Sequence, residues 1–287
     1  MTTVQRSSHA DVLAIIGAGG MGVAVARRMG AGRVVVLGDV NTTRVDSVAN
    51  ELTDDGHFVA TGHVDVTSRE SVAEFARSAA SSGRLSALVH TAGLSPEQAS
   101  AESVLAVDLL GVALTLEVFG EVIELGGAGV VIASMAGHFQ GSIPQEVEQR
   151  LATVSACDLL NLPECGPAAI TSSQQAYPFA NRANQLRVAA AASHWGRRGA
   201  RINSISPGII ATAMGRRELG GQSGDAMRAM INGSGARRVG TPEDIAAAVE
   251  FLLSSAASFI TGADLLVDGG VVAAVRTGTL DLATAGG

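Results

Sequence analysis

Residues 12–22 of the chain, VLAIIGAGGMG, place an apolar run directly before a cluster of glycines. The run Val12–Ile16 has the length and composition of a buried strand, and the stretch Gly22–Met29 has the apolar spacing of a helix. Between them, Gly17-Ala18-Gly19-Gly20-Met21-Gly22 has the form Gly-x-Gly-x-x-Gly, in which glycines let the backbone approach a pyrophosphate at the start of a helix. This stretch therefore predicts a strand, turn and helix that bind a dinucleotide.

Asp39 strengthens this interpretation, because it ends the next apolar run, which begins at Val34 and lies about 20 residues after the glycines. A carboxylate at this place accepts hydrogen bonds from the adenosine ribose and repels a 2′-phosphate. We therefore expect Asp39 and Val40 to contact NAD(H), and NADP to bind less well. The alternative is a tight turn followed by a solvent-exposed aspartate, which accounts less well for the order of strand, turn, helix and acid.

Strand and helix patterns alternate along the rest of the chain. Strands are predicted at Val34–Leu37, Phe58–Val64, Leu85–Val89, Val130–Ala133, Ile202–Ile205 and Leu265–Val267, and helices at Arg44–Leu52, Ser71–Ala79, Ser103–Val122, Phe179–Trp195 and Pro242–Leu253. Alternating strands and helices pair in parallel through crossovers, and apolar strands without polar interruptions indicate a sheet covered on both faces. The pattern predicts one doubly wound α/β domain of the Rossmann type, with a mainly parallel sheet of about seven strands.

The composition excludes several classes of partner. With a net charge of −7 and no basic run, the chain has no predicted surface for nucleic acid or for an anionic membrane. Met1–Ala10 lacks the apolar core of a signal peptide, and no later stretch reaches about 18 apolar residues, so a cytoplasmic protein is expected. Cys157 and Cys165 match no metal-ligand spacing and are expected to be free thiols rather than a disulfide. The expected partners are small molecules and further copies of the chain.

One long connection, residues 138–175, interrupts the alternation of strands and helices. It has a helical pattern at Gln145–Thr153, and it joins two segments that carry candidate catalytic residues. Connections of this length are usually functional or mobile, so we expect a lid over the substrate pocket. Its apolar side chains, Ile143, Leu151, Leu159, Leu160 and Leu162, would then favour a hydrophobic substrate. The alternatives are a surface insertion or an oligomer contact, with the leucines in the core.

Further motifs follow in the order found in the short-chain dehydrogenase/reductase family, which the chain resembles from about Leu13 to Gly270. They are Val64-Asp65-Val66, His90-Thr91-Ala92-Gly93, Ser134-Met135-Ala136-Gly137, the loop from Ser206 to Thr212, Thr261-Gly262 and Asp268-Gly269-Gly270. The resemblance implies an NAD(P)-dependent oxidoreductase that forms a homodimer or homotetramer. It also implies cofactor contacts from Asp65, Val66, Ala92, Gly93, Pro207, Gly208, Ile209 and Thr212.

The catalytic set implied by the resemblance departs from the family pattern. The family's Asn, Ser, Tyr and Lys correspond to Asp108, Ser134, Tyr177 and Asn181, and the chain contains no lysine at any position. Asp108 would act through its backbone, which in the family helps to hold a water near the lysine, and Ser134 would hydrogen-bond a substrate carbonyl. Asn181, one helical turn after Tyr177, can bond the nicotinamide ribose but supplies no charge. Pro178 fits the first turn of a helix, which would place Tyr177 at the helix start.

The missing lysine affects the two directions of hydride transfer differently. A free phenol has a pKa of about 10, and a nearby cation lowers it. As a general base at neutral pH, Tyr177 is about a thousandfold short of its deprotonated form, whereas as a general acid it already carries its proton. Arg182 lies about 100° round the helix from position 181, and His138 could enter the pocket but is more simply a solvated loop histidine. Reduction is therefore expected to survive better than oxidation.

Three hypotheses about function follow. The first is an NAD(H)-dependent reductase of a ketone, enone or imine in a hydrophobic small molecule, with an atypical catalytic tetrad. The second is a nucleotide-binding protein of the same fold with little redox activity, either an isomerase, cyclase or dehydratase, or a catalytically silent partner. The third is that a catalytic lysine was replaced deliberately, which the sequence does not separate from natural divergence.

Overall fold

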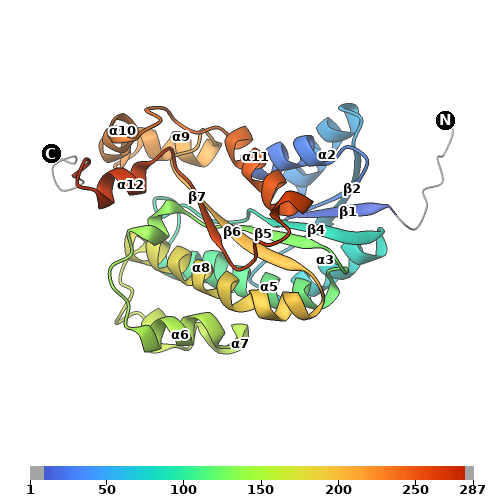
Figure 1. Ribbon diagram of the computed structural model, residues 1–287, viewed down its shortest axis with the longest axis horizontal. Coiled ribbons are helices and arrows are strands. Elements are labelled where there is room, and N and C mark those ends of the chain that lie inside the picture. Colours follow the sequence, from blue (N-terminus) through green and yellow to red (C-terminus); the bar gives the residue numbers. More distant parts are fainter. Residues whose placement is uncertain (1–9, 282–287) are drawn as a thin grey trace.

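Seven parallel strands form one sheet in the order β3-β2-β1-β4-β5-β6-β7 (Figure 1), in a computed structural model that describes residues 10–281. The strands are β1 (Asp11–Ile16), β2 (Val34–Asp39), β3 (Phe58–His63), β4 (Arg84–His90), β5 (Ala128–Ile132), β6 (Arg201–Pro207) and β7 (Asp264–Val267). All seven predicted strands are confirmed. The strand order reverses between β1 and β4, and in open sheets of this kind ligands bind at the carboxyl ends of the strands beside that reversal.

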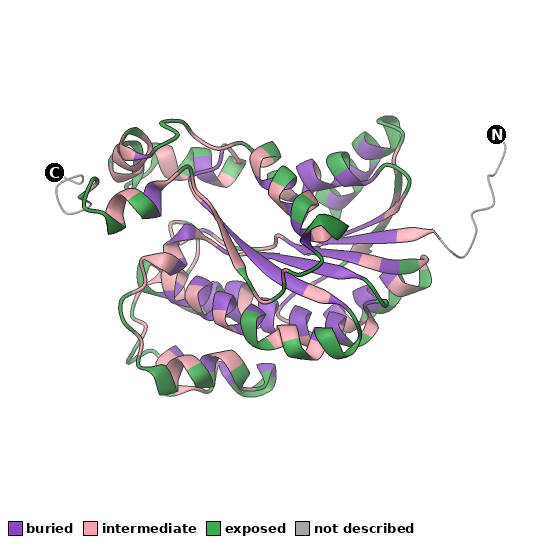
Figure 2. Ribbon diagram, viewed as in Figure 1, coloured by how far each residue is buried: buried purple, intermediate pink, exposed green. Residues whose placement is uncertain are grey.

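Helices cover both faces of the sheet, and alternate residues of each strand point to opposite faces. The longer helices are α1 (Gly20–Met29), α2 (Thr42–Asp54), α3 (Arg69–Ser81), α5 (Gly111–Val122), α8 (Ser173–Arg197) and α11 (Pro242–Leu253). Leu13 and Ile15 of β1 pack in the core with α1, α2 and α11, whereas Val12 and Ile16 pack in the core with α3, α5 and α8. Figure 2 shows the resulting buried strands between half-buried helices.

The helix before β5 contains a distortion at a candidate site residue. A short helix α4 (Ala101–Val104) leads into a π-helical turn, η1 (Leu105–Leu110), and then into α5. Asp108 lies in this π-helical turn, and such turns occur frequently at functional sites. The whole stretch Ala101–Val122 is long and apolar enough to cross a membrane, but 67% of its most apolar window is buried inside the fold, which is typical of a core helix.

Residues 138–175 contain the predicted helix α6 (Gln145–Thr153), followed by α7 (Ala156–Leu159) and the short turn η3 (Pro163–Cys165). In Figure 1, α6 and α7 lie against the side of α8 that faces away from α9 and α10. Arg187 of α8 donates to the carbonyls of Leu151 (2.8 Å) and Val154 (3.0 Å), and Glu117 of α5 accepts from the amide of Ala156 (2.7 Å). The helical middle of this segment is therefore a fixed insertion on α5 and α8.

This placement does not support a lid made of residues 138–175. Leu151 and Leu159 are fully buried core residues, and Ile143, Leu160 and Leu162 pack partly buried against the same core. The alternative of core leucines is therefore the correct one, and these side chains give no information about the substrate. Both cysteines are free thiols, as expected, with Cys157 exposed and Cys165 buried.

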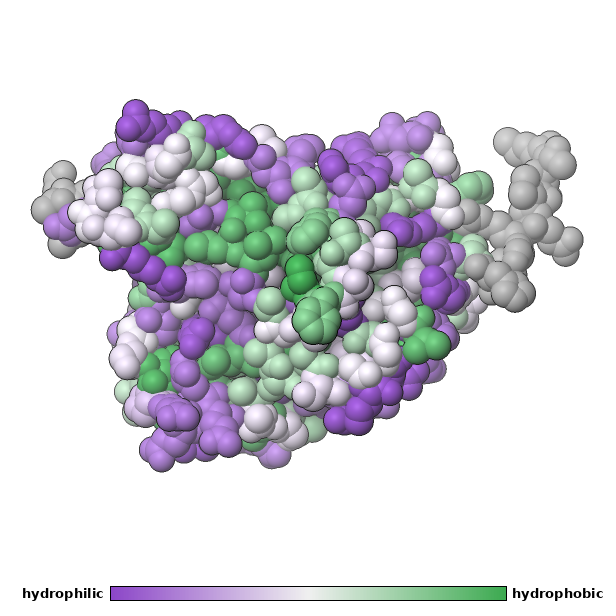
Figure 3. Space-filling view, in the orientation of Figure 1, coloured by the Kyte–Doolittle hydropathy of each residue, from purple (hydrophilic) through white to green (hydrophobic). Residues whose placement is uncertain are grey.

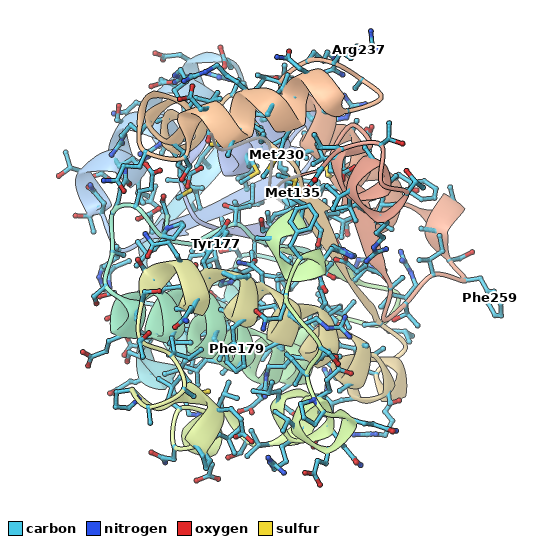
Figure 4. The ribbon with its side chains drawn as sticks, turned by 90° about the vertical axis from the view of Figure 1, so that its left-hand side faces the viewer. Met135, Tyr177, Phe179, Met230, Arg237 and Phe259 are labelled. Atoms are coloured by element: carbon cyan, nitrogen blue, oxygen red, sulfur yellow. The ribbon has the colours of Figure 1, made fainter. Side chains whose placement is uncertain are left out.

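Two short helices that the sequence patterns did not predict lie above the carboxyl ends of the strands (Figure 1). They are α9 (Ala213–Gly220) and α10 (Gly224–Gly233), and α12 (Val271–Arg276) packs beside them. The face shown in Figure 3 has apolar side chains gathered along β7, below α10 and α12. Phe259, in the turn before β7, points into solvent and is fully exposed (Figure 4). The helices that lie over the carboxyl ends of the strands on this side are thus α9 and α10.

Candidate functional site

A pocket of about 430 Å³ lies at the carboxyl ends of β1, β2 and β4, where the strand order reverses. Eleven of the predicted cofactor residues line it: Gly17, Gly19, Gly20, Met21, Asp39, Val40, Asp65, Val66, Ala92, Gly93 and Thr212. The lining also includes residues that the sequence analysis did not name, among them Asn41, Arg44, Leu94 and Arg217. Of the other predicted residues, Gly22, Pro207, Gly208, Ile209, Tyr177 and Asn181 are not part of this lining.

The glycines of the loop between β1 and α1 have separate structural tasks. Gly17 has a φ of 107°, and a Cβ there would meet the Thr91 hydroxyl at 2.5 Å, so this turn requires glycine. A Cβ on Gly22 would meet the carbonyl oxygen of Gly17 at 2.1 Å, which keeps α1 close to the loop. Gly19, at the start of α1, has no neighbouring atom within 4 Å of such a Cβ. Gly17 and Gly22 therefore shape the loop, and Gly19 leaves room for a pyrophosphate.

Asp39 lies in the pocket wall at the end of β2. Its carboxylate accepts from the backbone amides of Ala18 (2.8 Å) and Asn41 (3.0 Å), which ties the glycine loop to the end of β2. Each carboxylate oxygen retains a further lone pair for a ribose hydroxyl. Arg44, at the start of α2, donates its Nε to the carbonyl of Ala18 (2.7 Å) and brings a cation to the same wall. Asp65 also lies on this wall, with its side chain held by the amide and hydroxyl of Thr67.

The loop after β6 differs from the expectation. Thr212 lies in the pocket lining and caps α9 by accepting from the amide of Gly215 (3.0 Å). Gly208 packs so closely that a Cβ would lie 2.7 Å from the Cα of Asp268, and together with Ile209 it lines a second cavity of about 230 Å³ behind the loop. The loop therefore contributes Thr212 to the pocket lining, whereas Gly208 and Ile209 support it from behind.

Tyr177 lies in the gap between α8 and the helices α9 and α10, with Met135 and Met230 across from it (Figure 4). Burial raises the pKa of its phenol above the ordinary value, the Ser134 hydroxyl acts in the opposite direction, and the acids Asp108 and Glu218 raise it further when they are ionised. The side chains that act on the phenol thus include Ser134, as the sequence predicted. None of the groups that act on the phenol is a cation, and burial disfavours the phenolate, so the phenol stays protonated.

The start of α8 corrects one detail of the sequence analysis. The helix begins at Ser173 with Ser172 as its cap, so Pro178 lies inside the helix and Tyr177 is one turn from the start. The Ser173 hydroxyl donates to the carbonyl of Pro96 (2.6 Å) and fastens this first turn to the loop after β4. The sequence analysis placed the helix start too late because it relied on Pro178, whereas the helix is capped by Ser172, more than one turn earlier.

Asn181 is buried, at 4% exposed, and its Nδ2 donates to the carbonyl of Tyr177 one turn earlier (2.9 Å). This bond holds the amide against its own helix. A Cβ on Gly137 would lie 2.9 Å from the backbone carbon of Asn181, so the segment after Ser134 packs directly on this turn of α8. The hydrogen bond to a ribose that the sequence analysis expects from Asn181 would therefore have to use its Oδ1 or the second hydrogen of its Nδ2.

Asp108 connects the π-helical turn to two other elements. Its Oδ1 accepts from the backbone amide of Leu94 (2.7 Å), beside Gly93 of the pocket lining, and its backbone carbonyl accepts from Asn184 Nδ2 of α8 (2.6 Å). This carbonyl, for which the family resemblance implies a bound water, thus already accepts one hydrogen bond from Asn184. Burial raises the pKa of Asp108 to about 8, and the bond from Leu94 offsets this in part.

Glu218 of α9 is a functional candidate that the sequence analysis missed. Its Oε1 accepts from the Ser95 hydroxyl (2.5 Å), which closes α9 over the loop after β4. Burial raises the pKa of Glu218, Ser95 acts in the opposite direction, and the charge of Glu97 adds to the increase. No motif marks this residue, because α9 has no strong apolar periodicity.

The two candidate replacements for the missing cation lie elsewhere. Arg182 is bonded to Glu148 of α6 (2.6 Å), so it faces a neighbouring helix of the insertion. His138 is bonded to Asp264 (2.8 Å) and Arg276 (3.2 Å) near β7 and α12. Within residues 10–281, no group of three or more His, Cys, Asp or Glu side chains is arranged to hold a metal ion. The site is therefore a pocket at the carboxyl ends of β1, β2 and β4, together with a protonated phenol on α8.

Comparisons with known proteins match the chain along most of its length. Residues 11–145 match a family model described as short chain dehydrogenase, and residues 145–272 match one described as Enoyl-(Acyl carrier protein) reductase. Short-chain dehydrogenase/reductase bsc3 of Alternaria brassicicola is 40% identical over 264 residues, which cover 92% of this chain and 96% of the relative. Cis-4-hydroxycyclohexanecarboxylate dehydrogenase of Sinomonas cyclohexanicum is 31% identical over 258 residues, covering 89% and 94%.

Solved structures share the fold. A short-chain dehydrogenase/reductase from Serratia marcescens has a TM-score of 0.71 at 22% identity, covering 93% of this chain and all of that chain. A dehydrogenase/reductase from Sinorhizobium meliloti has a TM-score of 0.72 at 23% identity, covering 92% and 95%. At these identities the structural similarity shows the fold alone.

Proposed function

The chain belongs to the short-chain dehydrogenase/reductase family of nicotinamide-dependent oxidoreductases, and on this basis we propose that it uses NADH to reduce a ketone, enone or imine of a small molecule. The observation that carries the proposal is the environment of Tyr177, where burial raises the pKa of the phenol and none of the groups that act on it is a cation, so the phenol is protonated. A protonated phenol is ready to donate a proton and is a poor base. The site therefore favours reduction.

The residues present fit the cofactor that the family implies. Gly19 leaves open space at the start of α1 for a pyrophosphate, and Asp39 presents a carboxylate where the adenosine ribose would lie. The same carboxylate repels a 2′-phosphate, which supports NAD(H) over NADP. The bound cofactor would supply the hydride.

The chain's own groups supply the proton. Ser134 donates a hydrogen bond to the substrate carbonyl oxygen and orients it beside the Tyr177 phenol. For a ketone substrate, Tyr177 would transfer its proton to that oxygen, and the reduced product would be an alcohol. The resulting phenolate regains a proton from solvent. Without a cation beside it this phenolate is high in energy, so turnover is expected to be slow.

The apolar side chains of Met135 and Met230, across from Tyr177, support a substrate with an apolar body. These side chains belong to a small core that also contains Ile209 and Leu219. They lie across from Tyr177 in Figure 4, on the side covered by α9 and α10. Side chains of this kind bind apolar and cyclic groups by excluding water.

The test is NADH oxidation with a panel of cyclic ketones, enones and cyclic imines. Activity should be abolished in Tyr177→Phe, which keeps the ring and removes the proton, and NADH should support turnover better than NADPH. The matched control is Phe251→Leu, an exposed position on α11, which should behave as the unmodified protein does. Turnover that survives in Tyr177→Phe would remove the basis of the proposal.

The missing cation also favours a second candidate, a protein that binds NAD(H) and does not transfer a hydride. In that case calorimetry detects NADH binding, no substrate in the panel oxidises NADH, and any substrate conversion is a rearrangement independent of NADH consumption. Product analysis with and without NADH separates the two candidates.

A further inference from the structure

Two of the five buried side-chain atoms that lack a hydrogen-bond partner in the described part of the chain belong to residues that are bonded to each other. Among residues 10–281, Asp108 Oδ2 and Asn184 Oδ1 are buried without a hydrogen-bond partner, and the two residues are 5% and 2% exposed. Buried polar atoms without partners are few in native proteins, and each one costs free energy. An ionised carboxylate and an amide oxygen both only accept, so neither can satisfy the other.

The hydrogen bonds around this pair leave one place for a proton. Asn184 Nδ2 donates to the backbone carbonyl of Asp108, which fixes the orientation of the amide, because the exchanged orientation would set two oxygens against each other. Asp108 Oδ1 already accepts from the Leu94 amide. A proton on Asp108 Oδ2 would make that atom a donor. Asn184 Oδ1 would be its acceptor, because the side chain of Asn184 is already bonded to the backbone of Asp108.

The charges around Asp108 do not compensate an ionised carboxylate. His90 of β4 is buried, which lowers its pKa to about 4 and leaves it neutral. Tyr177 of α8 is a neutral phenol, and Glu218 of α9 is an acid whose charge acts on the same phenol. A buried carboxylate without a cation is unfavourable, and such groups take up a proton instead.

We propose that Asp108 is a neutral carboxylic acid in the folded protein, that it donates its Oδ2 proton to Asn184 Oδ1, and that this Asp108–Asn184 pair positions Tyr177 against the cofactor pocket. The proposal rests on the proposed reductase function for its effect on turnover. The pair joins three elements: the loop after β4 through Leu94, the π-helical turn through Asp108, and α8 through Asn184.

The position of Asn184 explains why this link reaches the phenol. Asn184 lies seven residues after Tyr177, which is two helical turns on nearly the same face of α8. Leu94 follows Gly93 of the pocket lining directly. The pair therefore holds the helix that carries the proton donor against the edge of the nucleotide pocket. Asp108 and Asn184 are positioning residues, since nothing places them against the substrate.

Infrared difference spectroscopy tests the protonation without any assay of activity. The unmodified protein at pH 7 should show the carbonyl stretch of a protonated carboxylic acid, and Asp108→Asn should lack it. Raising the pH to 10 should remove the band from the unmodified protein. If the two proteins give the same spectrum in this region at pH 7, the carboxyl of Asp108 is ionised and the proposal is wrong.

Kinetics test the positioning. Asn184→Leu removes both the donor and the acceptor, and it should lower kcat by about tenfold or more while the Kd for NADH stays within about twofold. In the unmodified protein kcat should fall with a midpoint near pH 8, as Asp108 ionises, and this fall should be absent in Asp108→Asn, whose amide donates at every pH. Glu121→Gln, at an exposed acid of α5, is the matched control and should keep the pH profile of the unmodified protein.

The two proposals fail in different ways. If no compound oxidises NADH but the infrared band behaves as described, the reductase function is wrong and the neutral Asp108 stands. If turnover depends on Tyr177 but the pH profiles of unmodified protein and Asp108→Asn coincide, the reductase function stands and the positioning role of Asp108 is refuted. The infrared test needs only the conservative variant, so it does not depend on the folding of Asn184→Leu.

Discussion

Replacing Asp108 by asparagine should make the folded protein progressively more stable than the unmodified chain as the pH rises from 5 to 8. The carboxyl has a pKa of about 8 in the folded protein, against an ordinary value of 3.8, because burial disfavours its charged form. The folded state therefore holds a proton that the unfolded chain has lost throughout this range. Stability contributed by this group is fully present below the unfolded pKa and is lost as the pH rises through the folded pKa.

The size of the effect follows from the width of this range. One pKa unit corresponds to about 1.4 kcal/mol, so the free energy of unfolding should fall by roughly 1.4 kcal/mol per pH unit through this one group. Between pH 5 and pH 8 the total is roughly 3–4 kcal/mol, and above pH 9 the curve should be flat. Asparagine does not titrate, and its amide can donate where the protonated acid donated.

Urea denaturation of both proteins at pH 5, 6, 7 and 8 measures this effect. The quantity of interest is the difference between their unfolding free energies at each pH, because ionisations common to both proteins cancel in it. Asp46→Asn, at an exposed position on α2, is the matched control and should follow the unmodified protein. A difference that stays constant within about 0.5 kcal/mol across this range would refute the neutral, buried state of Asp108.

Three further predictions concern other parts of the site and its support. Asn181→Lys should lower the pKa of Tyr177 and raise the rate of alcohol oxidation at pH 7 by about tenfold or more, measured as NAD⁺ reduction; an unchanged rate would show that this position does not control the phenol. Asp39→Ser should improve NADPH binding relative to NADH by about tenfold or more, since the repulsion ends and Arg44 can pair with the 2′-phosphate; calorimetry with both cofactors measures the ratio, and an unchanged ratio would contradict the role of Asp39. Arg187→Met removes two bonds from a guanidinium that is 6% exposed and should cost about 3 kcal/mol of unfolding free energy; a loss below about 1 kcal/mol in urea denaturation would contradict it.

The elements that the sequence predicted well are those whose determinants are local. Val12–Ile16 is an uninterrupted apolar run, so its strand and the glycine turn after it could be predicted together. The place of Asp39 in the pocket could be predicted because it depends only on where the next strand, β2, ends. Tyr177 and Ser134 were identified through a family pattern, and the structure shows that Ser134 acts on the phenol.

The elements that the sequence did not predict depend on contacts between distant segments. Glu218 lies near Tyr177 because Ser95 holds α9 from 123 residues away, and the sequence around it has no pattern that indicates this. Asn184 looks like an ordinary polar residue on a helix until the π-helical turn brings the carbonyl of Asp108 to it. The insertion was misjudged for the same reason, because proline content and length do not indicate which side of α8 a segment will pack on.

The attachment of α6 and α7 to α8 has a practical consequence for anyone who redesigns this enzyme. A segment of this length resembles a dispensable appendage that could be trimmed to obtain a smaller catalyst. Its removal would expose the buried guanidinium of Arg187 and would remove the two carbonyl groups that accept hydrogen bonds from it. Arg187 belongs to α8, the helix that carries the proton donor, and lies ten residues from Tyr177. Shortened versions of the protein should therefore keep α6 and α7, or replace Arg187 by an apolar residue at the same time.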